Sequence, residues 1–445
     1  MKTFLIIWLG QLISIIGSGL TSFALGVWIF EKTGQATPFA LTVLFGSLPR
    51  ILLSPIAGAL ADRWNRRKVM IIADSGDALV TLGVVVLLAT GRLEVWHIYL
   101  IALFSAMFAA FQEPAYTASI TMLVQKKDLA RASGLMQMGQ AMEMLVSPVL
   151  AGILFVAIGL NGIIVIDFVT YAFAVGALLS VRIPQPASSS ADAQGRKSIW
   201  SDAAYGWHYL RARTGLLGML LYFALVNFLL NFSAVLTGPL VLSFGAASAL
   251  GMVQTVSGVG MLAGSVVISA WGGPQRRIRG VFGAIMLSSI GLLLIGLQPS
   301  VLLISAGFFL LLFGVPIGSA SSQAIFQTKV APDVQGRVFA MRGMVSRSMM
   351  PLAFLLAGPL ADYVFGPLLS EGGALADTAI GSLIGVGAGR GVGLMFSLSA
   401  LTLMIATALA YANPRIRRIE DELPDALADQ AAAARSSASP DAERL

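Results

Sequence analysis

The stretch GALADRWNRRKV, residues Gly58 to Val69, decides the fold of this chain. It joins one long apolar segment, Thr37 to Ala61, to the next, Val69 to Thr90, so we expect the chain to turn there at a membrane surface. Asp62 ends the first of these predicted helices, where the helix dipole is already negative and disfavours an anion. Positive charge must therefore lie close to Asp62, and Gly58 lets a neighbouring helix approach.

Four basic residues follow Asp62 at once: Arg63, Arg66, Arg67 and Lys68. With them the stretch resembles the loop 2–3 signature of the major facilitator superfamily, G-x-x-x-D-R-x-x-R-R/K-x, with Asn65 where that family usually has glycine. The resemblance implies that Asp62 holds the two halves of a transporter together in one of its two states. The alternative is a positively charged membrane anchor in which the aspartate is accidental.

Composition places the chain in a membrane. Its 445 residues are 57% hydrophobic and only 11% charged, with a mean hydropathy of +0.83, whereas soluble domains carry about 25% charged residues. Apolar stretches long enough to span a bilayer as helices recur from Thr3 to Tyr411. The first, Thr3 to Phe30, is longer than the apolar core of a signal peptide and is expected to remain as helix 1. We predict an all-α polytopic membrane protein with twelve transmembrane helices in two pseudo-symmetric six-helix bundles.

Several classes of function are disfavoured. The chain has no cysteine, and its two histidines, His97 and His208, lie far apart, so we expect no metal site and no cofactor. No Ser/His/Asp grouping indicates an enzyme, and no phosphate-binding G-x-x-x-x-G-K-[ST] loop indicates an ATP-driven pump. The net charge of +7 lies in loops rather than in a nucleic-acid-binding patch, so no nucleic acid is expected as a partner.

The distribution of positive charge predicts the topology. Most lysines and arginines fall in loops on one face, whereas Lys32, Arg92 and Arg390 fall on the other. By the positive-inside rule both termini are cytoplasmic. We predict a multi-pass protein of the bacterial cytoplasmic (inner) membrane, monomeric, with the lipid bilayer, protons and a small-molecule substrate as its partners.

Four regions are expected: an N-terminal six-helix bundle (residues 1–183), a cytoplasmic linker with an amphipathic helix (184–213), a C-terminal six-helix bundle (214–412) and a disordered cytoplasmic tail (413–445). Internal repeats support two similar halves, because the segment around Arg131 aligns with that around Arg337. The loop WGGPQRRIRG repeats the opening motif with Arg276 and Arg277 but without its aspartate. The resemblance implies a substrate site between the halves, with Gly58, Asp62, Arg63, Arg66, Arg67, Arg131 and Arg337 forming a conformational gate.

Ionisable residues inside predicted spans are candidates for coupling transport to protons, because an unpaired charge costs about 2.5–3.5 kcal/mol at mid-membrane. Burial favours the protonated carboxyl and a nearby arginine favours the charged one, so a change of surroundings can drive proton uptake and release. Glu113 and Glu143 rank first, with Arg50 as the expected counter-charge. Asp77 and Asp167 are further candidates. The alternative for each is a structural ion pair within the N-terminal bundle.

The predicted cavity is lined by aromatic and neutral polar groups. The resemblance implies that helices 1, 4, 7 and 10 face it, and these carry eight candidates: Gln11, Ser14, Ser18, Phe108, Tyr116, Asn227, Asn231 and Gln323. This mixture suits a bulky amphipathic ligand better than a sugar or phosphate ester. Lipid contact or core packing is the alternative for any one aromatic side chain.

Further motifs resemble one branch of the superfamily. The segment GQAMEMLVSPVLAG resembles a weakened antiporter motif, and LPRILLSPIAGALADRWNRRKV, GRVFAMRG and AGPLADYVFGP resemble the macrolide-efflux and enterobactin-exporter branch of drug:proton antiporters. The resemblance implies export of a macrolide-like drug or a siderophore by proton antiport with alternating access. An importer of a small organic solute on the same fold, or a non-transport membrane enzyme or lipid-handling protein, are the alternatives.

Overall fold

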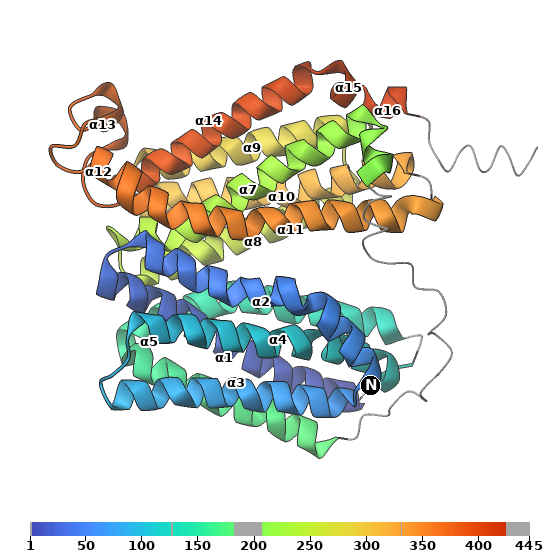
Figure 1. The fold of residues 1–445 in the computed structure, drawn as a ribbon, viewed down its shortest axis with the longest axis vertical. Coiled ribbons are helices and arrows are strands. Elements are labelled where there is room, and N and C mark those ends of the chain that lie inside the picture. The colour runs from blue at the N-terminus through green and yellow to red at the C-terminus, as the bar shows by residue number, and fades with distance from the viewer. Residues whose placement is uncertain (1, 126–127, 182–206, 331, 424–445) are drawn as a thin grey trace, which may run out of the picture.

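The computed structural model describes residues 2–125, 128–181, 207–330 and 332–423. Its long helices form two bundles that lie side by side, one above the other in Figure 1. The first half contains α1 (Lys2–Thr33), α2 (Ala36–Arg63), α3 (Arg66–Ala89), α4 (Val95–Leu123) and α5 (Leu129–Ser180). The second half contains α7 (Thr214–Leu242), α8 (Ala247–Trp271), α9 (Arg277–Leu297), α10 (Val301–Lys329), α11 (Pro332–Leu360) and α14 (Arg390–Ala412).

Eleven helices among the described residues are long and apolar enough to cross a membrane. One of them, α5, contains a break at Gly159, where φ is +65° and ψ is −174°, a conformation that favours glycine. The chain reverses direction there, so α5 supplies two of the predicted spans. The prediction of an all-α polytopic membrane protein with twelve spans is therefore confirmed.

The two ends of the bundle differ. We call the end that carries the N-terminus and α16 (Ile419–Glu422) the proximal end, and the end with the α1–α2 and α7–α8 connections the distal end (Figure 1). Short helices η2 (Ala361–Phe365), α12 (Gly366–Leu368) and α13 (Ala379–Ile384) occupy the long distal connection between α11 and α14.

Contacts between the halves gather toward the distal end. A Cβ added at Gly251 of α8 would lie 2.4 Å from the carbonyl oxygen of Pro148 on α5, and one at Gly358 of α11 would lie 2.5 Å from the Cα of Thr37 on α2. Such contacts require glycine, because any side chain would separate the two backbones. Small residues that allow close backbone approach are how membrane helices associate, since lipid offers no hydrophobic force between them.

The prediction of a disordered tail from residue 413 onward is wrong for the part that the structure describes, residues 413–423. Residues 414–422 form α15 (Pro414–Arg417) and α16, and the side chains of Ile416 and Ile419 are buried. Both isoleucines pack against glycines of α7, because a Cβ at Gly218 would lie 2.8 Å from Ile416 Cδ1 and one at Gly215 would lie 3.3 Å from Ile419 Cγ1. Two apolar anchors thus order a segment whose charge-rich composition indicates disorder. The rest of the tail, 424–445, and the predicted linker helix up to residue 206 lie outside the described residues.

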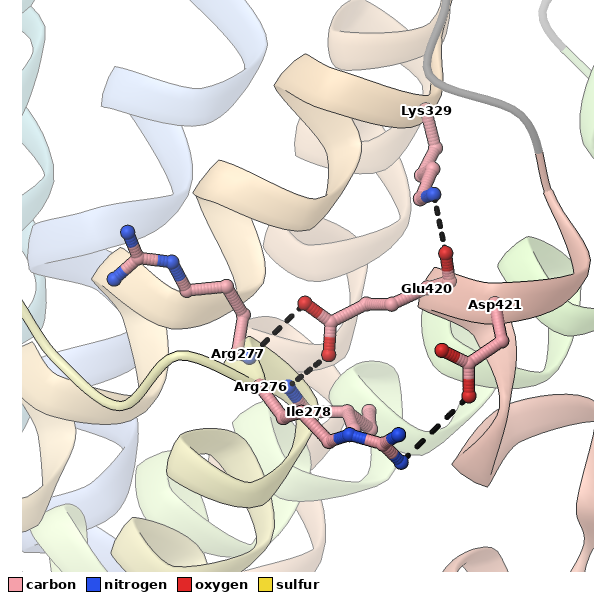
Figure 2. Close-up of polar contacts among 6 residues, drawn as sticks. All are labelled: Arg276, Arg277, Ile278, Lys329, Glu420 and Asp421. Atoms are coloured by element: carbon pink, nitrogen blue, oxygen red, sulfur yellow. Dashed lines mark hydrogen bonds and ion pairs between the residues drawn. The ribbon is translucent and has the colours of Figure 1, made fainter.

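Glu420 fixes this C-terminal segment to the start of α9. Its carboxylate accepts hydrogen bonds from the backbone N–H groups of Arg277 and Ile278, each 3.0 Å long, as Figure 2 shows. The Lys329 ammonium donates to the carbonyl oxygens of Glu420 and Leu423. The loop before α9 lacks the aspartate of the opening motif, and a carboxylate from the C-terminal segment lies against it instead.

We expect Glu420→Ala to lower the thermal stability of the purified protein. The substitution leaves two N–H groups at the start of α9 without their acceptor, and loss of a helix cap costs about 1 kcal/mol. Thermal unfolding followed by circular dichroism measures the change. The matched control is Glu422→Ala, an exposed position on the same short helix. Equal melting temperatures for the two variants would contradict a capping role for Glu420.

Candidate functional site

A cavity of about 780 Å³ lies between the two halves. Helices α1, α2 and α5 line it from the first half, and α7, α8 and α10 line it from the second. Most of its lining is apolar or small, with the aromatic rings of Phe23, Phe39 and Phe308. Its polar side chains include Asn227, Asn231, Gln254 and Glu143. A cavity of this volume with apolar walls and few polar groups suits a drug-sized ligand.

Glu143 lies where this cavity meets a second one. The second cavity, of about 240 Å³, lies within the first half, and Glu143 lines both. Gly19 of α1 faces this part of α5, because a Cβ there would lie 2.6 Å from Ser147 Oγ and 3.5 Å from Glu143 Cγ. The absence of a side chain at Gly19 therefore makes room for Ser147, one turn of α5 beyond Glu143, and Glu143 itself belongs to the walls of both cavities.

Glu113 and Arg50 line the second cavity together with Glu143. Glu113 precedes Pro114 within α4, and the side chains of Glu113 and Arg50 are both exposed. Among the described residues no ion pair joins Arg50 to either glutamate. The structure thus brings the three ranked residues to one cavity, and their role in proton coupling stays a prediction.

Asp77 and Asp167 lie in the interior of the first half. Asp77 accepts hydrogen bonds from the hydroxyls of Ser105 and Tyr171. The Tyr171 hydroxyl also lies 3.0 Å from Ser18 Oγ. Asp167 is 1% exposed, and Thr170 Oγ1 lies 3.5 Å from its carboxylate. Neutral hydroxyls from α1, α4 and the second span of α5 therefore surround these two acids.

Asp74 belongs to a hydrogen-bonded chain that sequence reasoning did not find. The Gln11 amide donates to Asp74 Oδ2 over 2.8 Å, and the Gln112 amide donates to Gln11 Oε1 over 2.5 Å. Gln11 and Gln112 line the second cavity, whereas Asp74 is buried. The chain connects a buried carboxyl on α3 to the cavity. Its sequence signal was the position of Asp74 three residues before Asp77, which puts both acids on one face of a helix.

Four of the eight residues predicted for the substrate cavity line one of these cavities. Asn227 and Asn231 line the large cavity between the halves. Gln11 and Tyr116 line the second cavity. The two asparagines of α7 thus face the space between the halves, whereas Gln11 and Tyr116 face the interior of the first half.

The other four predicted cavity residues contact neighbouring helices. Ser14 is buried and Ser18 bonds to Tyr171. Phe108 packs on α3, where a Cβ at Gly76 would lie 2.4 Å from its ring. Gln323 accepts a 3.0 Å hydrogen bond from the Arg342 guanidinium, which also lies 4.7 Å from the centroid of the Phe326 ring. The rotation of each helix about its own axis decides these contacts, and the hydropathy of the sequence alone does not specify that rotation.

The predicted gate residues are partly described. The Arg67 guanidinium donates to the carbonyl oxygens of Leu178 and Leu179, 2.9 Å each, at the end of α5, where a cation is favourable. Asn65 caps α3 by accepting from the backbone N–H of Lys68, which gives this departure from the family pattern a structural role. Arg66 is buried, Arg131 exposed and Arg337 partly buried. The side chains of Asp62 and Arg63, and the surroundings of Gly58, lie outside the described part.

Asp362 is a contact between the halves that sequence reasoning missed. Its carboxylate accepts hydrogen bonds from the backbone N–H groups of Ala36 and Thr37, at 2.8 and 2.7 Å, so an acid from the second half caps the first turn of α2. An anion at a helix N-terminus is favourable. The sequence carried an indication of this role, because AGPLAD at 357–362 repeats AGALAD at 57–62, the segment that ends with Asp62.

Comparisons with known proteins agree with this architecture. The sequence model of the family described as "Major Facilitator Superfamily" matches residues 7–354 of this chain. Macrolide efflux protein A of Streptococcus pyogenes is 29% identical over 370 residues, which cover 81% of this chain and 90% of that protein. The multidrug efflux pump Tap of Mycolicibacterium fortuitum is 23% identical over 78% of this chain and 86% of its own length. Enterobactin exporter EntS of Salmonella typhi is 28% identical over 34% of this chain and 37% of its own length.

Solved structures share the fold at low sequence identity. A bacterial homologue of the human lysosomal transporter Spinster, in an inward-facing and unoccupied conformation, aligns with a TM-score of 0.69 and 15% identity over 95% of this chain and 98% of its own. The nucleoside transporter NupG aligns with a TM-score of 0.62 and 14% identity over 92% of this chain and 99% of its own. On its family match and its fold, the chain is a membrane transporter, not an enzyme, and belongs to the Major Facilitator Superfamily.

Proposed function

We propose that the protein exports a bulky amphipathic small molecule, of macrolide-like or siderophore-like chemistry, by proton antiport with alternating access. The cavity between the halves carries this proposal. Its volume of about 780 Å³ fits such a ligand, its walls are mainly apolar, and its amides and one carboxylate can orient polar groups of the ligand. The names of the similar proteins, which concern macrolide, multidrug and enterobactin export, support the same substrate class.

Glu143 is the proposed proton carrier. It lies at the junction of the two cavities, so one carboxyl is within reach of a ligand in the larger cavity and of water entering the smaller one. A ligand that displaces water around Glu143 changes the relative free energies of its charged and protonated forms. Glu113 and Arg50 share the smaller cavity and form the proposed path for the proton.

Because the contacts between the halves gather at the distal end, they support a state in which the large cavity opens at the proximal end. We propose that Asp362 stabilises this state by capping α2, and that Asp62 takes the corresponding role toward α11 in the opposite state. The matching AGALAD and AGPLAD sequences support the symmetry of the two roles. The positive loops favour a cytoplasmic proximal end in the bacterial cytoplasmic membrane, with both termini inside and the protein acting as a monomer.

We expect Glu143→Gln to abolish uphill transport. In everted membrane vesicles energised with a pH gradient, uptake of a radiolabelled macrolide should fall to the level of vesicles that lack the protein, because glutamine cannot carry a proton. Exchange of labelled for unlabelled macrolide across de-energised vesicles should persist, since the cavity is intact. Uphill transport by the Glu113→Gln variant is measured in the same assay.

The matched control is Glu371→Gln, an exposed glutamate in the distal connection, which should leave uphill transport unchanged. Undiminished gradient-driven uptake in both Glu143→Gln and Glu113→Gln would refute proton coupling through these residues. Absence of macrolide uptake by the unaltered protein, with uptake of a siderophore instead, would decide between the two substrate chemistries.

We expect Asp362→Asn to shift the protein toward the state that is open at its distal end. The amide removes the negative charge at the N-terminus of α2 and one of the two acceptors, which weakens the distal contact by about 1 kcal/mol, a factor of about five in the population ratio. The chain has no cysteine, so spin labels at Thr90→Cys and Gln298→Cys report the distance between the distal ends by double electron–electron resonance.

Asp377→Asn, in the same distal connection and exposed, is the control and should leave the distance distribution unchanged. A longer distal distance is expected to gain population in Asp362→Asn only. An identical distribution in the two variants would mean that Asp362 does not contribute to closing this end.

A further inference from the structure

A basic cavity of about 380 Å³ lies at the proximal end of the second half, away from the cavities described above. The loop and first turn of α9, the end of α14 and the C-terminal segment meet around it. The residues that matter here are four arginines, one tyrosine and one acid: Arg276, Arg279, Arg417, Arg418, Tyr411 and Asp421. Positive charge therefore exceeds negative charge in its lining.

The C-terminal segment holds these arginines in place. Ile416 and Ile419 are buried against α7, and Glu420 caps α9, so Arg417 and Arg418 lie on a docked backbone. Figure 2 shows Arg276, which precedes α9, joined to Asp421 of α16. The Glu420 carboxylate accepts from the N–H groups of α9, and among the described residues no ion pair joins it to an arginine of the cavity.

Charge in the cavity is only partly balanced. Arg276 lies 3.6 Å from Asp421, and both side chains are more than half exposed. The Arg417 guanidinium lies 5.5 Å from the centroid of the Tyr411 ring. Arg279 and Arg418 are exposed and form no ion pair with any residue in the described part of the chain. The cavity can therefore accept an anion.

An apolar groove continues from this basic cavity. The groove, about 420 Å³, lies between α9 and α14 and shares Arg279 and Tyr411 with the basic cavity. Phe282, Met286 and Ala408 also line it, and a Cβ at Gly283 would meet no atom within 4 Å. Both helices are membrane spans, so the groove runs from the bilayer surface toward the hydrocarbon region.

We propose that the basic cavity and the groove together bind an anionic phospholipid. The phosphate lies against Arg279 and Arg418, with Arg276 and Arg417 beside it, and one acyl chain follows the groove past Gly283. Clustered basic side chains at a membrane surface attract anionic headgroups, and a tyrosine at the boundary suits the interface. The groove favours a lipid over a soluble phosphate, because only a lipid fills both parts. The proposal does not depend on the transported substrate or on the direction of transport.

The test is lipid retention by the purified full-length protein. Native mass spectrometry in detergent, titrated with cardiolipin, phosphatidylglycerol or phosphatidylethanolamine, gives the affinities. We expect the two anionic lipids to bind more tightly than phosphatidylethanolamine. The double variant Arg279→Ala/Arg418→Ala should lose about 30-fold in affinity for them, because each arginine near a membrane surface contributes a factor of about five. Arg211→Ala/Arg415→Ala, two exposed arginines outside the cavity, should retain the affinity.

A second arm separates a lipid from a soluble anion. Gly283→Phe fills the groove and leaves every arginine in place, so it should weaken lipid binding, whereas Gly176→Phe, at an open glycine of the first half, should not. Soluble glycerol phosphate should bind more weakly than the intact lipid. Equal binding of glycerol phosphate and lipid, with no effect of Gly283→Phe, would overturn the proposal in favour of a soluble-anion site. Unchanged lipid affinity in the double arginine variant, or no preference for anionic lipids, would overturn it outright.

Discussion

The contact between the two halves at the distal end is the constraint on which the rest of this structure depends. There the Asp362 carboxylate of one half accepts hydrogen bonds from the first N–H groups of α2 in the other. A glycine beside it allows two backbones to touch, as Gly358 does against Thr37. An acid at a helix N-terminus and close packing of small residues are both short-ranged. Such contacts join the two halves at the distal end.

Because the inter-half contacts gather toward one end, space remains between the halves nearer the middle of the bundle. The large cavity occupies that space, and Glu143 connects it to the smaller cavity inside the first half. Gly19 lets α1 lie close to α5 at Ser147, one turn of the helix beyond Glu143. Packing of small residues thus determines where the halves meet and how closely α1 approaches α5 near Glu143.

The C-terminal segment gives the second half a different proximal surface from the first. Glu420 lies against α9 where the loop has lost the aspartate of the opening motif, and two buried isoleucines hold the segment on α7. The same docking gathers arginines from separate parts of the chain into one cavity. Composition predicted disorder for this segment, because its few apolar residues become anchors only when glycines of α7 lie opposite them.

The sequence by itself determined the number of spans, the family and the position of the ionisable groups along each helix. Hydropathy is a local property, and a run of about 20 apolar residues has one outcome in a bilayer. Only the tertiary structure decided which of these groups face a cavity. Asn227 lines the large cavity, whereas the Ser18 hydroxyl is hydrogen-bonded to that of Tyr171. The carboxylates of Asp74, Asp362 and Glu420 find their hydrogen-bond donors on helices that are distant in the sequence. The rotation of each helix depends on its neighbours, so no single segment encodes the direction in which its polar residues point.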